Sequence, residues 1–596
     1  MVNSKLSVLL TASALSVLTW NAASANGQEG LQNIDIVACN NNTNLGGNPV
    51  PYAAKPGDTV NESIPVLNNS GNVTWSVASF IHQCTVSGTT SAVCGKYTVT
   101  APDGAVDNTH PVTVTGSGFT NADIGFSNDF TLTVTDATPN TCKIRYELQV
   151  TSDSGGWGDP HLTTVDGVAY DFQGAGEYTL LRQKELEIQA RQAPVPTTTT
   201  PVLSAHTGLA SCVSYYTAFA ARIGKNDVSY EPSSERGTTT SVMQLRVNHD
   251  VVTIPAAGID LYGGDEGDGG GEGSPSAASA AGSKHLVGHI ANVPGNEGSI
   301  EISNSHGTRI DVVPSPWPDQ HSWLLTINAY NTTAVEGLWG RTIDGWLPAK
   351  SDGTSVGAKG TTTADVYNQV YGQLGESWRV TKDTSLFDYA EGTSTDTFTN
   401  KAWPGSGDCK IEGQQPLPPA TVQVAEQACS AVVDPTHRND CIFDVTWTGF
   451  TGFGQNYSTA EHVQRGAVTV TVTDDKNPTQ QGEPATFHVT VAEAAPRNQG
   501  TPTGTLQLTV DGSPSGSAVT VDSTGKGTIT TPDLPVGTHQ VVVKFTPAKD
   551  VVFVSGASLV TTHTVTGSTG LPWWVIILLV ILLILIILWL MKSKKP

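Results

Sequence analysis

The sequence predicts a mainly β, multidomain protein with one membrane-crossing helix near its C-terminus. The chain has 596 residues, a length that is typical of several domains. Short runs with apolar residues at every second position recur along most of it, and Gly and Pro punctuate them. An uncharged, wholly apolar stretch occupies residues 573–591.

Residues 1–25 have the pattern of a secretory signal peptide. Lys5 precedes a largely apolar run, and Ala23-Ser24-Ala25 fits a cleavage site for small residues. A short membrane anchor is the weaker alternative, because the apolar run is too short to span a bilayer comfortably. We therefore expect the mature chain to begin at Asn26, outside the cytoplasm.

Region 26–155 predicts a β-sandwich of immunoglobulin-like shape. Its alternating runs include 96–100, 130–134 and 143–150. Alternation gives each strand one apolar face, and two sheets bury such faces against each other.

Region 156–410 carries the most specific motif of the chain. It opens with Gly158-Asp159-Pro160-His161, continues with Asp166-Gly167 and Tyr170-Asp171-Phe172, and ends at Gly174-x-Gly176-x-Tyr178. Gly-Leu-Trp-Gly follows at 337–340 and Glu-Ser-Trp-Arg-Val at 376–380. In order and spacing, these landmarks resemble a von Willebrand factor type D domain, although Gly176 and Trp339 stand where disulfide-rich members have Cys. The resemblance implies a β-rich extracellular module for binding or assembly.

Two further regions complete the ectodomain. Region 411–466 is a Cys-containing connecting segment with helical periodicity, and it resembles the short helical segment that often follows a type D domain. Region 467–566 predicts a second immunoglobulin-like sandwich. Its landmarks, Gly-Thr-x-x-x-x-Val-Asp-Gly at 504–512 and Leu-Pro-x-Gly-Thr-His at 534–539, resemble those of the repeats in bacterial surface adhesins. That resemblance implies a spacer that holds a functional head away from a membrane.

The stretch 573–591 predicts a transmembrane helix. At about 1.5 Å per residue it covers about 28 Å, close to the thickness of the bilayer's hydrocarbon core. Trp residues lie at both ends, and the lysines of the tail 592–596 indicate the cytoplasmic side. We expect a single-pass cell-membrane protein whose N-terminal ectodomain lies at the cell surface or in a periplasm. A span that is removed after export is the alternative.

Composition narrows the function classes. The net charge of −23 argues against nucleic acid as a partner. The sequence contains no His-Glu-x-x-His, no phosphate-binding glycine loop and no Cys-x-x-Cys, so we expect a protein that is not an enzyme.

Eight cysteines, an even number, predict disulfide bonds outside the cytoplasm. The alternative is that one pair stays reduced. The prediction combines two local pairs with two that follow by elimination: Cys84–Cys94 and Cys429–Cys441, then Cys39–Cys142 and Cys212–Cys409.

The type D resemblance implies a calcium site. In relatives, the Gly-Asp-Pro-His aspartate resembles a calcium ligand that works with an acidic loop after Gly-Leu-Cys-Gly. The corresponding positions are Asp159, Asp344 and Asp352, although Arg341 stands where the family has Asn. Clustered oxygen ligands suit this hard cation. The alternative is that Asp159 caps a turn.

The same tetrapeptide implies a second activity. In some mucin-like relatives, Gly-Asp-Pro-His is cut between Asp and Pro by the protein itself. Here the Asp159 carboxyl would attack its own carbonyl carbon, Pro160 would supply the leaving amine, and His161 would move the proton.

The favoured function is therefore adhesion, or binding of an unidentified protein or glycan, at the cell surface. An envelope spacer protein is the first alternative, and a self-cleaving module is the second. The two leading functions differ in whether the ectodomain binds foreign surfaces or only its own envelope.

Overall fold

The computed structural model describes residues 34–36, 50–67, 69–83, 85–86, 89–90, 96–183, 185–198, 202–236, 241–263, 286–293, 296–317, 322–405, 409–465, 468–493, 501–531, 533–548, 553, 556–567 and 573–592. The predicted signal peptide, Cys39, Cys84 and Cys94 lie outside the described residues, as do residues 593–596. The chain divides into two compact units, 1–464 with 496–500 and 465–495 with 501–596.

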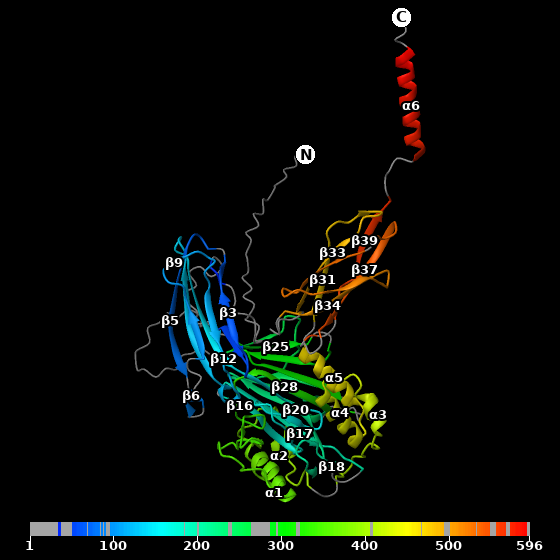
Figure 1. Ribbon diagram of the computed structural model, residues 1–596. Coiled ribbons are helices and arrows are strands. Elements are labelled where there is room, and N and C mark those ends of the chain that lie inside the picture. The colour runs from blue at the N-terminus through cyan, green and yellow to red at the C-terminus, as the bar shows by residue number, and fades with distance from the viewer. Residues whose placement is uncertain are drawn as a thin grey trace, which may run out of the picture. The chain divides into compact units, whose positions relative to one another are not determined.

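The N-terminal region of the first unit is a sandwich of two sheets around one core (Figure 1). In β10 (Val112–Gly116), Val112 and Val114 are buried and Thr115 is exposed, as period-two alternation requires. One sheet has the order β3-β10-β8, and the other has the order β2-β12-β11-β5-β9. The remaining strands are β2 (Val50–Ala54), β3 (Val60–Ile64), β5 (Val73–Gln83), β8 (Tyr97–Thr100), β9 (Ala105–Val106), β11 (Ser127–Thr135) and β12 (Thr141–Val150).

Two large antiparallel sheets form the central region. The eight-stranded sheet has the order β15-β14-β13-β28-β27-β26-β25-β24, and the six-stranded sheet has the order β16-β17-β20-β21-β22-β23. Their facing side chains share one core that includes Phe219, Ile327 and Trp339. The first sheet consists of β13 (Ser152–Trp157), β14 (His161–Thr163), β15 (Ala169–Asp171), β24 (Ile259–Tyr262), β25 (Leu286–Asn292), β26 (Ile300–Asn304), β27 (Arg309–Pro316) and β28 (Trp323–Thr332). The second consists of β16 (Gly176–Gln183), β17 (Leu186–Pro194), β20 (Ser214–Ile223), β21 (Asn226–Pro232), β22 (Met243–Val247) and β23 (Asp250–Val251).

Strand β16 brings the type D-like landmarks together. The backbone N–H groups of Leu338 and Trp339 donate to the carbonyls of Thr179 and Leu180. From the Glu-Ser-Trp-Arg-Val landmark, the N–H of Val380 donates to the carbonyl of Glu177. Trp339 is fully buried, so its ring fills core volume.

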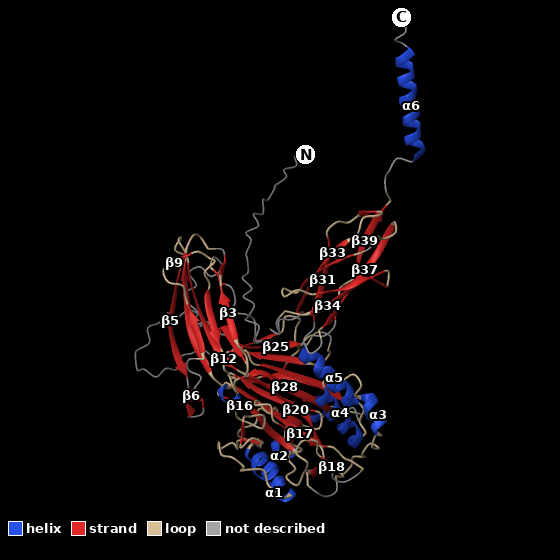
Figure 2. Cartoon of the chain, viewed as in Figure 1, coloured by secondary structure: helices blue, strands red, loops and turns tan. Residues whose placement is uncertain are grey.

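Three helices lie beside the central sheets: α3 (Val422–Ala428), α4 (Pro435–Thr448) and α5 (Gly452–Arg465) (Figure 2). Asp434 caps α4 by accepting hydrogen bonds from the N–H groups of Thr436 and His437, and Pro435 occupies the first turn. Gly449 ends α4 in the left-handed conformation. An apolar layer joins these helices to the sheets, with Trp157, Tyr215 and Leu324 on one side and Val445, Phe453 and Tyr457 on the other. Residues 411–464 therefore belong to the first compact unit, which is called the head below.

The second unit contains an immunoglobulin-like sandwich. Its sheets have the orders β31-β33-β36 and β32-β39-β37-β34-β35, with β38 paired to β37. Val489, Leu508 and Val543 lie in the core between them. The strands are β31 (Val468–Asp474), β32 (Thr479–Gln480), β33 (Thr486–Glu493), β34 (Gly504–Val510), β35 (Ser513–Thr520), β36 (Lys526–Thr530), β37 (Gly537–Pro547), β38 (Gly556–Ala557) and β39 (Thr561–Thr566).

The chain also forms a 20-residue helix, α6 (Trp573–Lys592). Among the helices in the described part of the chain, none is found to be both long and apolar enough to cross a membrane.

Two disulfide bonds lie within the described residues, and both join predicted pairs. Cys212 bonds Cys409 at a sequence separation of 197, and Cys429 bonds Cys441 where α3 meets α4. Cys142 is also disulfide-bonded. Each cross-link restricts the unfolded chain, and the effect is larger for the longer loop.

His306 connects the central region to the N-terminal sandwich. Its Nδ1 lies 3.0 Å from Glu147 Oε2, and its Nε2 lies 2.8 Å from Glu185 Oε2. These two hydrogen bonds and the two negative charges outweigh burial and raise the pKa of His306 from 6.5 to about 10.

The His306 contact predicts a pH-dependent contribution to stability. The raised folded-state pKa means that the contribution is complete below about pH 6.5 and is lost as pH rises through about 10. His306→Gln should therefore lower the melting temperature of the head at about pH 6, and the difference from wild type should shrink steadily toward about pH 10. Thermal unfolding of wild type and His306→Gln across this pH range measures the difference in melting temperature. A difference that does not change with pH would contradict the role given to the charged His306.

Candidate functional site: a buried His-Asp centre

The Gly-Asp-Pro-His motif forms the turn of the hairpin between β13 and β14. Trp157 pairs with His161 across the two strands, which leaves Gly158, Asp159 and Pro160 as the turn. Gly158 has φ +58°, and a Cβ atom there would overlap the Asp444 carboxylate and the Tyr457 hydroxyl. Two reasons therefore favour glycine at position 158. The backbone there is in the left-handed region, and α4 approaches too closely to leave room for a Cβ atom.

His161 lies at the centre of three carboxylates. Its Nδ1 is 2.6 Å from Asp171 Oδ1, and its Nε2 is 2.8 Å from Asp159 Oδ1 and 2.9 Å from Asp444 Oδ1. The His161 side chain is 3% exposed, and the three aspartates are completely buried. Burying an ionised side chain away from water costs folding free energy unless neighbouring charges and hydrogen bonds compensate it.

Asp171 is fixed as the ionised member of this group. It pairs with His161 across β14 and β15, and its Oδ2 accepts hydrogen bonds from the N–H groups of His206 (2.6 Å) and Thr207 (2.7 Å). Burial opposes ionisation, but the bond and charge of His161, the charge of His206 and these N–H groups lower the pKa of Asp171 to about 2.

Asp159 and Asp444 form the opposite side of the centre. Burial is the largest cause that raises the pKa of each carboxyl above its ordinary value, and the partner's negative charge raises that of Asp444 further. Against the effect of burial, these two carboxylates raise the pKa of His161. Asp444 Oδ2 accepts from the Tyr457 hydroxyl at 3.0 Å and from the N–H of Asp159 at 3.2 Å. Neither carboxylate oxygen of Asp159 has a hydrogen bond of good geometry.

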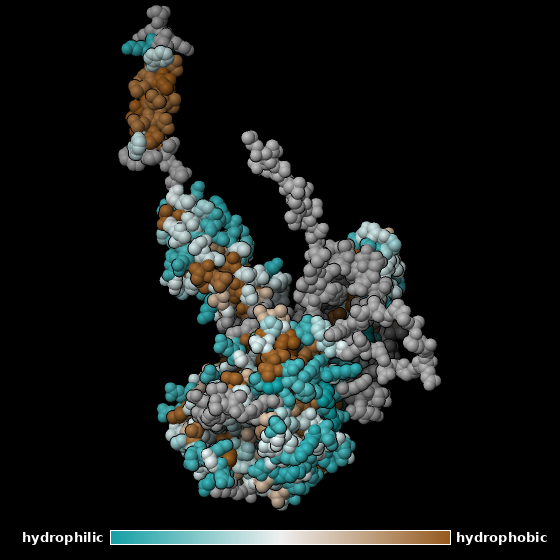
Figure 3. Space-filling model, turned by 180° about the vertical axis from the view of Figure 1, so that it is seen from behind, coloured by the Kyte–Doolittle hydropathy of each residue, from teal (hydrophilic) through white to brown (hydrophobic). Residues whose placement is uncertain are grey.

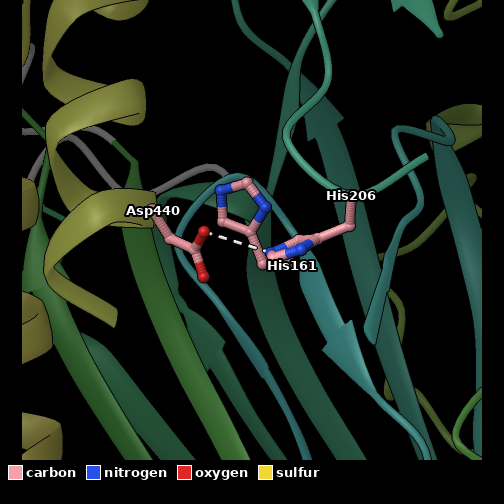
Figure 4. Close-up of side chains that lie close together, drawn as sticks. All are labelled: His161, His206 and Asp440. Atoms are coloured by element: carbon pink, nitrogen blue, oxygen red, sulfur yellow. Dashed lines mark ion pairs between the residues drawn. The ribbon is translucent and has the colours of Figure 1, made fainter. Parts of the chain in front are cut away.

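A second histidine extends the centre toward solvent. His206 Nε2 lies 3.1 Å from Asp440 Oδ1 in α4, and the His206 side chain is 21% exposed. The rings of His161 and His206 meet edge to face, with centroids 5.4 Å apart. Figure 4 shows His161, His206 and Asp440 converging from the sheet, a loop and the helix. The hydrogen bond to Asp440 is the main cause that raises the pKa of His206.

The centre gives two sets of side chains that are suited to a metal ion. They are His161 with His206 and Asp440, and Asp159 with His161 and Asp444, and in each set the ligand atoms lie within 4.8 Å of one another. Sequence reasoning found Asp159 and His161 but missed Asp171, His206, Asp440 and Asp444. Of these four, only Asp171 lies in a motif that the sequence analysis had singled out, Tyr-Asp-Phe, so it could have been included in the candidate site.

The predicted calcium ligands do not come together. Asp344 and Asp352 are exposed and accept hydrogen bonds from Ser355 and Thr354, whereas Asp159 is buried beside His161. Among the metal-binding groups found in the described residues, none contains Asp344 or Asp352. The structure does not gather the three predicted calcium ligands into one site, because the turn that carries Asp159 faces α4.

A different aspartate faces the loop after Gly-Leu-Trp-Gly. The Thr342 hydroxyl donates to Asp166 Oδ2 at 2.6 Å, and the Thr342 N–H lies 3.2 Å from both carboxylate oxygens. The loop after Gly-Leu-Trp-Gly therefore supplies hydrogen-bond donors to the Asp166 carboxylate through Thr342.

One contact bears on the predicted self-cleavage. Gln173 Nε2 donates a hydrogen bond of 3.1 Å to the backbone carbonyl oxygen of Asp159, which is the carbonyl of the Asp159–Pro160 bond. Gln173 Oε1 is held by the N–H of Ser214 at 2.7 Å. The amide is therefore oriented to stabilise negative charge that develops on that oxygen.

Comparison with known families supports one of the predicted domains. A model described as "Bacterial Ig-like domain (group 3)" matches residues 471–566, and the match does not extend to region 156–410.

Solved structures give weaker likenesses. The CARDB domain of a Pyrococcus furiosus protein in complex with di-metal ions has 12% identity, with 17% of this chain and 94% of that chain covered, at a TM-score of 0.14. A 1.5-MDa bacterial ice-binding adhesin has 9% identity, 87% and 94% coverage and a TM-score of 0.13. Dimeric latent PorU from Porphyromonas gingivalis has 7% identity, 88% and 33% coverage and a TM-score of 0.14. TM-scores this low carry no argument about fold or function.

The fold and the family match together define the class of protein. The chain is a mainly β, multidomain protein with a bacterial immunoglobulin-like domain, and its disulfides indicate a location outside the cytoplasm.

The Gly158 contact yields a prediction with a matched control. Gly158→Ala should destabilise the head by about 3 kcal/mol or more, because the new Cβ meets Asp444 and Tyr457 in addition to the backbone cost. Gly167→Ala has a comparable φ of +80° with nothing within 4 Å of the new Cβ, so it should cost only about 1–2 kcal/mol. Urea unfolding compares the two variants, and equal losses would show that α4 does not press on the turn.

Proposed function

We propose that this chain is a membrane-tethered display protein whose head binds an external protein or glycan. The observation that carries the proposal is the order of its parts, in which a bacterial immunoglobulin-like domain separates a compact head from an apolar C-terminal helix. Spacer domains of this kind hold a head away from the surface to which the chain is tethered. We propose that the head has the type D fold and acts by binding, without enzymatic turnover.

The proposed anchor is α6. No helix in the described part of the chain meets the criterion for a membrane span, so the proposal rests on the composition of α6 and on its exposed apolar surface. The sequence has no charged residue from Trp573 to Met591, and a lysine ends the helix. Large apolar side chains are exposed along it from Trp574 to Leu590, and they form the continuous brown surface of this helix in Figure 3. A bilayer would remove that surface from water, at about 25 cal/mol for each Å² that is buried.

A truncation tests the anchor. The full-length chain should fractionate with membranes and require detergent for release, whereas a chain that ends after residue 567 should be released as a soluble protein. A chain that ends at Lys592 keeps α6 and serves as the control, which should stay in the membrane fraction. Release of the full-length chain without detergent would contradict the anchor.

Binding is tested with the whole protein. Full-length chain in vesicles should adhere to surfaces coated with matrix proteins or glycans, and vesicles without protein should not. Capture only by envelope preparations of the same cells would instead identify an envelope spacer.

The Gln173 contact favours a second candidate, self-cleavage at Asp159–Pro160. A carboxylate oxygen of Asp159 would bond to its own carbonyl carbon while Gln173 stabilises the oxyanion. The carbon–nitrogen bond would then break, and the Pro160 nitrogen would take a proton from His161. Water would open the resulting anhydride and return a proton to His161, so that atoms and charge balance.

The chain contains an internal control for this reaction, the bond between Asp434 and Pro435. There the Asp434 carboxylate is engaged by the N–H groups of Thr436 and His437, at 2.8 and 3.1 Å. Incubation of the folded protein, followed by reducing, denaturing electrophoresis and sequencing, should give one new N-terminus at Pro160 and none at Pro435. Gln173→Leu should slow the cut by about 10²-fold or more. A chain that remains uncut would end this candidate.

A further inference from the structure

We propose that the buried centre around His161 binds one divalent transition-metal ion of the zinc class. The ligands are His161 Nε2 and one carboxylate oxygen each from Asp159 and Asp444, atoms that lie within 4.8 Å of one another. The site goes beyond the display function and does not depend on it. It shares Asp159 with the calcium set that the sequence suggested, but its other ligands are His161 and Asp444 in place of Asp344 and Asp352.

The orientation of His161 prepares one nitrogen for a metal. Asp171 holds Nδ1 at 2.6 Å, and the N–H groups of His206 and Thr207 hold Asp171 in turn. A histidine that gives its Nδ1–H to a carboxylate presents the lone pair of Nε2 on the opposite side. That nitrogen points at both Asp159 and Asp444, at 2.8 and 2.9 Å.

Asp159 is the independent sign that a cation belongs here. Its carboxylate is completely buried, and neither oxygen has a hydrogen-bond donor in good geometry. Nε2 carries at most one proton, so it cannot donate to two carboxylates at the same time. A single cation placed among the three groups would satisfy Nε2 and both carboxylates together.

The surroundings favour a divalent cation. Three completely buried aspartates surround one histidine. A cation of charge +2 among them would attract each ionised carboxylate in a site where burial limits screening by water.

The ligand types indicate which cation is bound. An imidazole nitrogen with carboxylate oxygens suits zinc and neighbouring first-row metals, and three protein ligands leave a position for water. Calcium prefers six to eight oxygen ligands, which a single histidine and two aspartates do not provide.

His206 and Asp440 provide the route to this site. His206 is 21% exposed and its ring meets that of His161, while Asp440 lies 3.1 Å from His206 Nε2 (Figure 4). These two residues form the second metal-suited set together with His161. An ion that arrives from solvent would meet this set first and then the buried ligands.

The test uses the full-length chain in detergent, purified without a polyhistidine tag. After treatment with a chelator, the protein is titrated with zinc and with calcium, and metal content is measured after dialysis. We expect one zinc ion per chain, a higher melting temperature with zinc, and no stoichiometric calcium. Cobalt in place of zinc should give the absorption spectrum of a low-coordinate site.

Variants assign the ligands. Asp159→Asn keeps the shape of the side chain and should weaken zinc binding by about 100-fold or more, and His161→Gln should do the same. The matched control, Asp352→Asn, removes an exposed carboxylate and should leave binding unchanged. If Asp159→Asn does not fold, His206→Gln should still slow zinc uptake. Absence of stoichiometric zinc, or equal zinc affinity in wild type and Asp159→Asn, would overturn the proposal.

Discussion

The structure of the head depends on one buried contact, between His161 in the hairpin turn and Asp444 in α4, which are 283 residues apart in sequence. The turn carries Asp159 and His161 into a fully buried site, where Asp171 of β15 and Asp444 of α4 are their other partners. Removing His161 would leave three buried carboxylates without their shared partner, and removing Asp444 would take away the one carboxylate that α4 contributes; both changes alter a buried charge network and are costly in proteins. The contact therefore holds the segment 411–466 against the sheets.

Apolar packing and polar pairing support each other around this contact. Trp157, Phe453 and Tyr457 form part of the apolar layer between the helices and the sheets. The Tyr457 hydroxyl then donates to Asp444, so one side chain serves both the core and the charge centre. The same low dielectric that makes an unpaired group costly strengthens each hydrogen bond that is made. This arrangement explains why the turn needs glycine at position 158.

Much of the fold could be predicted from local patterns. Period-two alternation indicated the strands of both sandwiches, and Cys429 and Cys441 were close enough in sequence to suggest the bond that joins α3 to α4. The motif around Asp159 and His161 also lies at the buried His-Asp centre.

The composition of that site could not be predicted. Asp444 and Asp440 come from a helix far along the chain, and neither lies in a motif that points to His161. The three aspartates of the calcium prediction are not brought together, because a sequence landmark does not show which way a turn faces. Asp159 faces α4, whereas Asp166, a few residues later, faces the loop that was expected to help bind calcium.

The central claim is that the turn and α4 form one buried charge centre, and a double-mutant cycle tests it most directly. Free energies of unfolding of the head would be measured for wild type, His161→Gln, Asp444→Asn and the double variant. Two groups in direct contact should be coupled by about 1–3 kcal/mol, so the double variant should lose less stability than the two single losses combined. Losses that add to within about 0.5 kcal/mol would mean that the two residues act independently, and would contradict the account.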